Sequence, residues 1–278
     1  MKGGAKANGF TIVETLIVLA VTGALFLSAA ALINGKEART EFTQSIQSVQ
    51  SQLQETINEV QSGYYPSEGN FTCSAASGVL QFTNSRNGQG TNKGCVFIGK
   101  VIAFLPASGN NDQQFQIYTV VGLQKDSSGA EVSSLNDATA VVLAPNSVVP
   151  NVPNEVQTGG IEYATNADHM YYNNDTSAKI IAVGFISSLG QYNGGNLLSG
   201  SQQVNLLPIP ISAVGVTLAD QITNYLRTVG DTTPYNPTGG IQLCFESGTT
   251  RESGLITIGG PNSATSVNLQ RFSTNGCS

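Results

Sequence analysis

Few residues of this chain have the types and spacings that enzymes use for chemistry. The single histidine, His169, follows Asp168, and serine is abundant, so the components of a Ser–His–Asp site are present. However, no GxSxG motif supplies an exposed nucleophile, and no GxxxxGK[ST] loop is available to bind phosphate. The remaining carboxylates are scattered along the sequence. We therefore predict that the protein is not an enzyme, that it uses no cofactor, and that His169 lies in an exposed loop.

Two asparagine-rich clusters are the best candidates for a metal site. Asn110-Asn111-Asp112 and Asn173-Asn174-Asp175 carry oxygen atoms of the kind that bind calcium, but neither has the spacing of an EF-hand loop. Asn and Asp also stabilise turns through hydrogen bonds to their own backbone. We interpret both clusters as turns and predict no metal site.

The four cysteines are Cys73, Cys95, Cys244 and Cys277. They contain no CxxC pair, which argues against zinc and thioredoxin-like redox sites. Outside the cytoplasm an even number of cysteines indicates disulfides. Three pairings are open, and we favour Cys73–Cys95 and Cys244–Cys277 because both are local. Such loops would each contribute about 3–4 kcal/mol on the chain-entropy model.

A carboxylate inside an apolar run is the most unusual feature of the sequence. Residues 10–33 read FTIVETLIVLAVTGALFLSAAALI, with Glu14 as their single charge. As a helix this run would be about 36 Å long, enough to cross a hydrocarbon core of about 30 Å. Lys2 and Lys6 precede it and are expected to stay in the cytoplasm by the positive-inside rule. We predict a single-pass protein of the cytoplasmic membrane with its head outside the cytoplasm.

Two ordinary interpretations of this segment explain only part of it. A cleaved secretory signal has an apolar core of about 7–15 residues, which is shorter than the run here. A signal anchor explains the length and the lysines. It does not explain Glu14, because a carboxylate within a membrane is costly and usually has a partner.

In register with this carboxylate, the N-terminus resembles the processing signal of the prepilin family, the type IV pilins and pseudopilins. Gly9 matches the last residue of the basic leader 1–9, Phe10 the new N-terminus, and Glu14 the glutamate at the fifth position. The resemblance implies that a prepilin peptidase cuts between Gly9 and Phe10 and that the Phe10 amine is N-methylated. It also implies that Glu14 pairs with the Phe10 amine of an adjacent subunit during assembly. Ala31 departs from the family pattern, since many members carry a helix-kinking proline there.

The resemblance implies a function as a type IV pilus-like filament subunit that polymerises through its N-terminal helix. Its partners would be other pilin subunits, the prepilin peptidase, the inner-membrane assembly machinery and the cytoplasmic membrane. The large head favours a minor pilin, with adhesion as one role. The alternatives are a pseudopilin of a type II secretion or DNA-uptake machine, and a signal-anchored surface enzyme or binding protein that never polymerises.

Composition narrows these classes further. The 278 residues include 12 basic and 18 acidic side chains, which gives a formal charge of −6. With a pI near 4.7 and no basic block, the chain lacks the charge of a nucleic-acid binder that neutralises phosphates. Only one apolar run is long enough to span a bilayer, which excludes a polytopic membrane protein.

Residues 34–62 continue the helical period beyond the apolar run. Gly63 is a plausible C-cap with Pro66 just beyond it, so we predict one helix from residue 10 to residue 62. The residues of one face form an apolar stripe that we expect to pack on the protein's own head, with a parallel coiled coil as the alternative. The stripe consists of Phe42, Ile46, Val49, Leu53, Ile57 and Val60.

Residues 63–278 are predicted to form a β-rich head, so the expected fold class is α+β, with the long helix packed on that head. A short helix capped by Thr217 is expected at 217–229, and the proline-containing stretch 146–154 is a candidate link between two lobes. The candidate strands are rich in Val, Ile, Phe and Thr. They are Val79–Thr83, Val96–Phe104, Phe115–Val121, Thr139–Leu143, Lys179–Ser187, Ile241–Glu246, Leu255–Ile258 and Ser266–Phe272.

Overall fold

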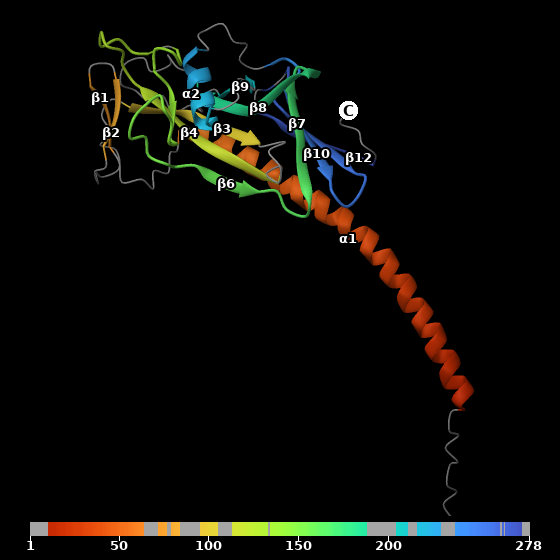
Figure 1. Ribbon diagram of the computed structural model, residues 1–278. Coiled ribbons are helices and arrows are strands. Elements are labelled where there is room, and N and C mark those ends of the chain that lie inside the picture. The colour runs from red at the N-terminus through yellow and green to blue at the C-terminus, as the bar shows by residue number, and fades with distance from the viewer. Residues whose placement is uncertain are drawn as a thin grey trace, which may run out of the picture.

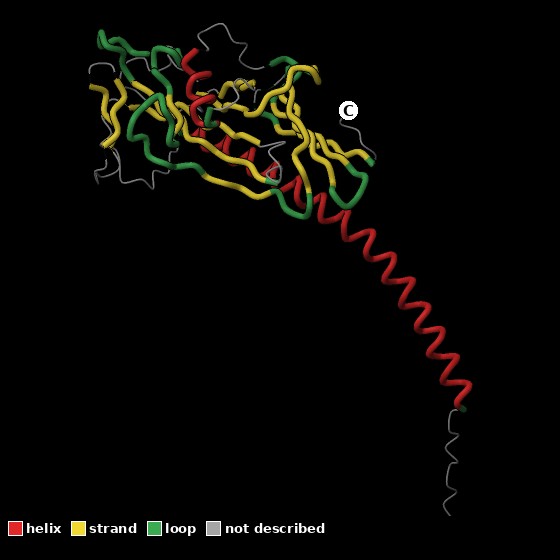
Figure 2. The backbone as a smooth tube through the Cα atoms, viewed as in Figure 1, coloured by secondary structure: helices red, strands yellow, loops and turns green. Residues whose placement is uncertain are grey.

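The protein is an α+β molecule in which a long N-terminal helix projects from a β-rich head (Figures 1 and 2). The structure is a computed structural model. It describes residues 11–63, 72–76, 79–83, 95–104, 113–132, 134–187, 204–210, 216–228, 237–261, 263 and 265–273. The predicted fold class is confirmed in these terms.

Helix α1 runs from Ile12 to Ser62, which is 51 residues or about 77 Å. Thr11 caps its start, because the Thr11 side-chain oxygen accepts a hydrogen bond from the Glu14 backbone N–H at 3.3 Å. Gly63 ends it with a φ of 63°, a left-handed conformation that glycine adopts without strain. The helix passes position 31 without a break and curves gently (Figure 1). The predicted continuous helix and its glycine cap are therefore confirmed from residue 12 onward.

One large antiparallel sheet forms the body of the head, in the order β12-β11-β10-β7-β8-β3-β4-β5, with β6 paired to β4 and β9 paired to β8. A separate hairpin of β1 and β2 follows the helix. The strands are β1 (Thr72–Ala76), β2 (Val79–Thr83), β3 (Cys95–Phe104), β4 (Gln114–Leu123), β5 (Val141–Val142), β6 (Gln157–Gly160), β7 (Thr165–Tyr172), β8 (Asp175–Ser187), β9 (Val204–Pro210), β10 (Ile241–Ser247), β11 (Ser253–Ile258) and β12 (Val267–Phe272).

Each predicted strand has a counterpart, although several bounds differ. The poorest match is 139–143, of which only Val141–Val142 is strand, because Thr139 has a φ of 44° in the preceding turn. The strand patterns do not predict β1, β6, β7 or β9. The stretch 146–154 does not divide the sheet, since β3 and β4, which precede it, pair with β8 and β6, which follow it.

The two faces of the sheet bury two hydrophobic cores. The six residues of the α1 stripe are all 2% exposed or less and pack on one face with Phe104, Phe185 and Phe245. On the opposite face, α2 (Leu218–Thr228) buries Ile222 and Leu226 against β3, β4 and β9 residues. The prediction that the stripe packs on the protein's own head is confirmed. The stripe is therefore not available for the alternative, a coiled coil.

Asp220, in the first turn of α2, links this helix to Ser147 in the loop that follows β5. Thr217 caps the helix as predicted, since its hydroxyl oxygen accepts a hydrogen bond from the Asp220 backbone N–H at 3.2 Å. The Asp220 carboxylate accepts hydrogen bonds from the Ser147 backbone N–H, the Ser147 hydroxyl at 2.9 Å and the Thr217 hydroxyl at 2.8 Å. These bonds, led by the one from the Ser147 backbone, lower the pKa of Asp220 below its usual value.

Asp220→Asn should destabilise the head at neutral pH by about 1–3 kcal/mol, because the neutral amide is a poorer acceptor for these donors. The folded pKa of Asp220 is depressed below the unfolded value of about 3.9. The stabilisation is therefore present above that value and is lost as the pH falls through the lower folded pKa. Thermal melts of the two proteins should differ at pH 7 and converge in acid. Asp137→Asn, at an exposed turn position, is the matched control, and a gap that persists undiminished in acid would contradict this account.

Candidate functional site

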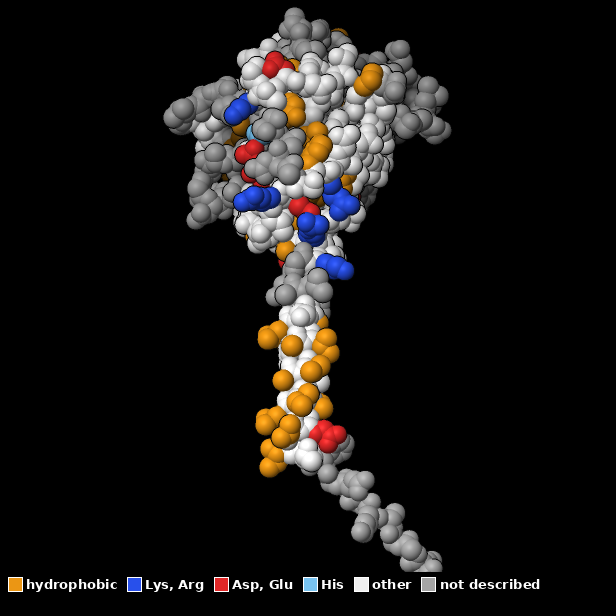
Figure 3. Space-filling view, turned by 90° about the vertical axis from the view of Figure 1, so that its right-hand side faces the viewer, with side chains coloured by type: hydrophobic (Ala, Val, Ile, Leu, Met, Phe, Trp, Pro, Cys, Tyr) orange, Lys and Arg blue, Asp and Glu red, His pale blue; other side chains and the backbone are white. Residues whose placement is uncertain are grey.

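The half of α1 that leaves the head is the candidate site. Residues 11–29 are exposed around the whole helix, and ten large apolar side chains between Ile12 and Leu27 are 54–81% exposed. Figure 3 shows these apolar side chains along the stalk below the head. The stretch Ile12–Ala30 has a mean hydropathy of 2.2 and is long enough to cross a membrane. A helix that is exposed and apolar on all sides is typical of a segment that a bilayer or partner helices cover.

Hydroxyl groups in this stretch are satisfied within the helix itself. Thr15 donates to the Ile12 carbonyl at 2.8 Å, Thr22 to the Val18 carbonyl at 2.8 Å, and Ser28 to the Ala24 carbonyl at 2.9 Å. Such bonds allow Ser and Thr to lie in an apolar environment without an outside partner.

Glu14 is the one polar side chain of the segment 12–30 for which the described structure shows no partner. It lies in the first turn of α1, where the helix dipole favours a negative charge by about 0.3–1 kcal/mol. A carboxylate enclosed in a membrane or in an apolar helix bundle is costly and usually has a partner. The dipole does not offset that cost, so a buried Glu14 requires a cation from elsewhere. Gly9 and Phe10 lie outside the described residues.

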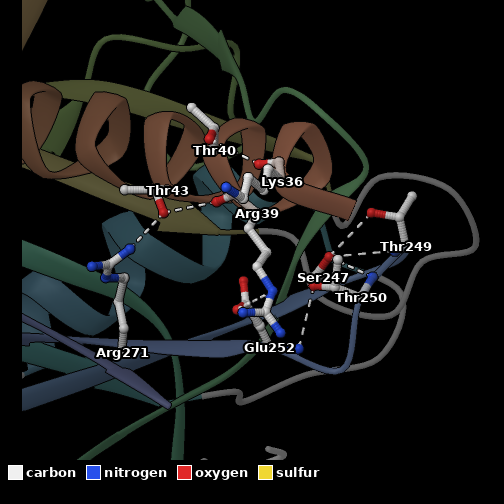
Figure 4. Close-up of polar contacts among 9 residues, drawn as sticks. All are labelled: Lys36, Arg39, Thr40, Thr43, Ser247, Thr249, Thr250, Glu252 and Arg271. Atoms are coloured by element: carbon white, nitrogen blue, oxygen red, sulfur yellow. Dashed lines mark hydrogen bonds and ion pairs between the residues drawn. The ribbon is translucent and has the colours of Figure 1, made fainter. Parts of the chain in front are cut away.

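Polar contacts fix the other half of α1 at the base of the head (Figure 4). Arg39 Nε lies 3.4 Å from a carboxylate oxygen of Glu252, and Arg271 Nη1 donates to the Thr43 hydroxyl at 2.6 Å. Between these contacts is a cavity of about 530 Å³. It is lined by Arg39, Thr40, Phe42, Thr43, Glu252, Arg271, Phe272 and Ser273.

An ion pair fixes the upper end of α1. Lys100 Nζ on β3 contacts the Glu59 carboxylate in the last turn of the helix. The Lys100 side chain is 1% exposed, whereas that of Glu59 is 24% exposed. An ammonium group this deeply buried needs a counter-charge, so the pair sets the register of the helix on the sheet.

The cysteines of the described structure are all oxidised. The predicted Cys73–Cys95 disulfide is present and ties the β1–β2 hairpin to the start of β3. Cys244 on β10 is also disulfide-bonded. Cys277 lies outside the described residues, so its pairing with Cys244 stays a prediction.

The prediction that His169 lies in an exposed loop is wrong. His169 is on β7, between β10 and β8, where its ring stacks on Tyr171 with centroids 5.4 Å apart and its Nδ1 contacts the Asp168 carboxylate. One possible ligand atom from each of Asp168, His169 and Cys244 lies within 4.8 Å of the others. Because Cys244 is disulfide-bonded, its sulfur is not a thiolate ligand. Among the described residues, two side chains of the group remain, fewer than a zinc site uses.

Asn173 and Asn174 form the turn between β7 and β8, as their sequence predicts. Both have a φ of 57°, the positive value that a type I′ hairpin turn requires at its two central residues. Their side-chain oxygens accept hydrogen bonds from the Gly239 backbone N–H at 3.1 Å and from Gln242 Nε2 at 2.6 Å. These oxygens are therefore satisfied by the protein itself. The other cluster, 110–112, lies outside the described residues.

Comparison with known proteins identifies no relative. No family model matches the chain, and no match was found among the curated proteins or among the solved structures.

Removing either partner of the Glu59–Lys100 pair should have unequal effects on stability. Glu59→Leu leaves the buried Lys100 ammonium without a counter-charge and should cost about 3–5 kcal/mol. Lys100→Met leaves a carboxylate that is already partly hydrated, so its loss should be only about 1 kcal/mol, as for an exposed pair. The double variant should recover much of the Glu59→Leu loss. Denaturant unfolding of the full chain in detergent measures this, and equal losses for the two single variants would contradict it.

Proposed function

We propose that this protein is a type IV pilus-like filament subunit, a pilin or minor pilin, which polymerises through the exposed half of α1. Before assembly the apolar run 10–33, which contains the segment Ile12–Ala30, would hold the subunit in the cytoplasmic membrane, with the head outside the cytoplasm. After assembly the head would lie on the surface of an extracellular filament. The observation that carries the proposal is Glu14. The described structure shows no partner for it, whereas the rest of the segment is apolar or has its hydroxyl groups bonded to carbonyls of the same helix.

The prepilin-like signal would supply the missing partner of Glu14. Hydrolysis of the Gly9–Phe10 peptide bond would create a primary amine four residues before the carboxylate. That amine is a cation at neutral pH, methylated or not. In a bundle of parallel helices displaced along the filament axis, the amine of one subunit would neutralise Glu14 of its neighbour. An unpaired carboxylate in such a bundle is strongly disfavoured, so the pair would select one axial register.

The projecting apolar half of α1 suits both polymerisation and simple anchoring, and Glu14 is the feature that favours polymerisation. The head covers the docked half of α1 around the stripe from Phe42 to Val60, whereas residues 11–29, which project from the head (Figure 1), are exposed. A plain anchor also needs an apolar helix, but it has no use for a carboxylate at position 14. A pseudopilin of a secretion or DNA-uptake machine would share the same helix chemistry.

Glu14→Ala should leave membrane insertion and cleavage after Gly9 intact. It should reduce entry into filaments at least about tenfold, because a loss of about 1.4 kcal/mol in the pairing of subunits lowers the association constant by that factor. The measurement is quantitative mass spectrometry of sheared filaments and of membranes from cells that produce both variant and wild-type chains.

Glu55→Gln, an exposed carboxylate in the head-bound half of α1, is the matched control and should enter filaments normally. Equal amounts of Glu14→Ala and wild-type chains in filaments would overturn the proposal. So would a wild-type chain that is absent from filaments, which is the result that the signal-anchored alternative predicts.

A further inference from the structure

Basic side chains gather at the end of the head from which α1 emerges, although the whole chain has a net charge of −6 (Figure 3). We call this group the basic rim. It consists of Lys36 and Arg39 on α1, Arg251 on the β10–β11 turn, and Arg271 on β12. All four residues are exposed.

Carboxylates near the helix exit do not cancel the basic rim. At 100° per residue, Glu37 and Glu41 project from a different face of α1 than Lys36, Arg39 and Thr43. Among the described residues, Glu252 is the single carboxylate that lines the cavity between Arg39 and Arg271, and it already pairs with Arg39. The cavity side of the helix exit is therefore positive.

The guanidinium groups of Arg39 and Arg271 can accept a further anion. Arg39 uses Nε on Glu252, and Arg271 uses Nη1 on the Thr43 hydroxyl (Figure 4). Each guanidinium has five N–H donors in a planar fork, which matches the oxygens of a phosphate group. These contacts hold the two side chains beside one cavity of about 530 Å³, which is large enough for a headgroup phosphate.

The distance to the membrane fits such a ligand. The apolar run ends at residue 33, so Lys36 and Arg39 lie about 4.5 Å and 9 Å further along the helix axis. The headgroup layer of one leaflet is about 5–7 Å thick. Side chains of a helix lean toward its N-terminus, which here is toward the membrane. Lys36 and Arg39 thus reach the headgroups, Arg271 lines the same cavity as Arg39, and Arg251 directly precedes Glu252, which pairs with Arg39.

We propose that the basic rim binds the phosphates of anionic phospholipids in the extracytoplasmic leaflet and seats the head on the membrane before assembly. This inference rests on the membrane insertion of α1 in the proposed function, but not on filament formation. Extraction of a subunit into a filament would then have to break these contacts.

The test uses the full chain in nanodiscs of phosphatidylcholine alone or mixed with phosphatidylglycerol, with hydrogen exchange at the β10–β11 turn as the readout. Phosphatidylglycerol should slow exchange there by about fivefold, because the attraction of one cation to anionic headgroups changes a binding equilibrium by about that factor. High salt should abolish the difference between the two lipids. Arg39→Gln with Arg271→Gln should also abolish it. The matched control is Lys125→Gln with Lys179→Gln, which changes the charge equally. Lys179 lies toward the end of β7 that is remote from the β10–β11 turn.

Equal exchange in the two lipids, or an equal loss in the control variant, would overturn the proposal. Hydrogen exchange that slows only when a disc holds two chains, whether or not phosphatidylglycerol is present, would also overturn it and would assign the basic rim to contacts between copies of the chain. The salt titration uses the wild-type chain, so the test does not depend on the variants folding. A chain that binds phosphatidylglycerol but keeps residues 1–9 would contradict filament assembly alone.

Discussion

The rest of the structure depends on the packing of six apolar side chains of α1 against one face of the sheet. Each contributes about 1.5–3 kcal/mol when it is removed from water, so together they outweigh any single polar contact in the molecule. Their spacing fixes which side of the helix faces the head. Gly254 on β11 permits the close approach, since a Cβ there would lie 2.4 Å from Ile46 Cδ1. Once this half of the helix is docked, the other half cannot reach the sheet and is left bare.

The few charged residues near the helix mark its boundaries. Glu59 with Lys100 fixes the upper end of the docked half, and the more exposed pair of Arg39 with Glu252 lies at the lower end, where the helix leaves the head. Glu14 is different because the described chain offers it no cation. The hydroxyl groups of this helix bond within the helix, so the Glu14 carboxylate is the group that requires a cation from outside. In the proposed function, the N-terminal amine of a second subunit would supply that cation.

Local patterns in the sequence predict some of these features and not others. The α1 stripe, the Gly63 cap and the Thr217 cap follow from spacing and residue type alone, and all three are confirmed. Strand β7 is missed because TNADHMYY contains a single β-branched residue and a polar centre, and its place is set by β10 and β8 on either side. Glu14 is visible as a local anomaly. The contacts of Arg39 and Thr43 are not, since Glu252 and Arg271 lie more than 200 positions further along the chain and meet the helix only through the sheet topology.

Intact mass with N-terminal fragmentation, on the protein purified from its native host, tests the central claim most directly. A filament subunit of this kind should begin at Phe10 and carry one additional methyl group. That result would establish the amine that Glu14 requires. A chain that retains residues 1–9 in a host with an active prepilin peptidase would contradict the account, because the Phe10 nitrogen would then remain an uncharged peptide amide.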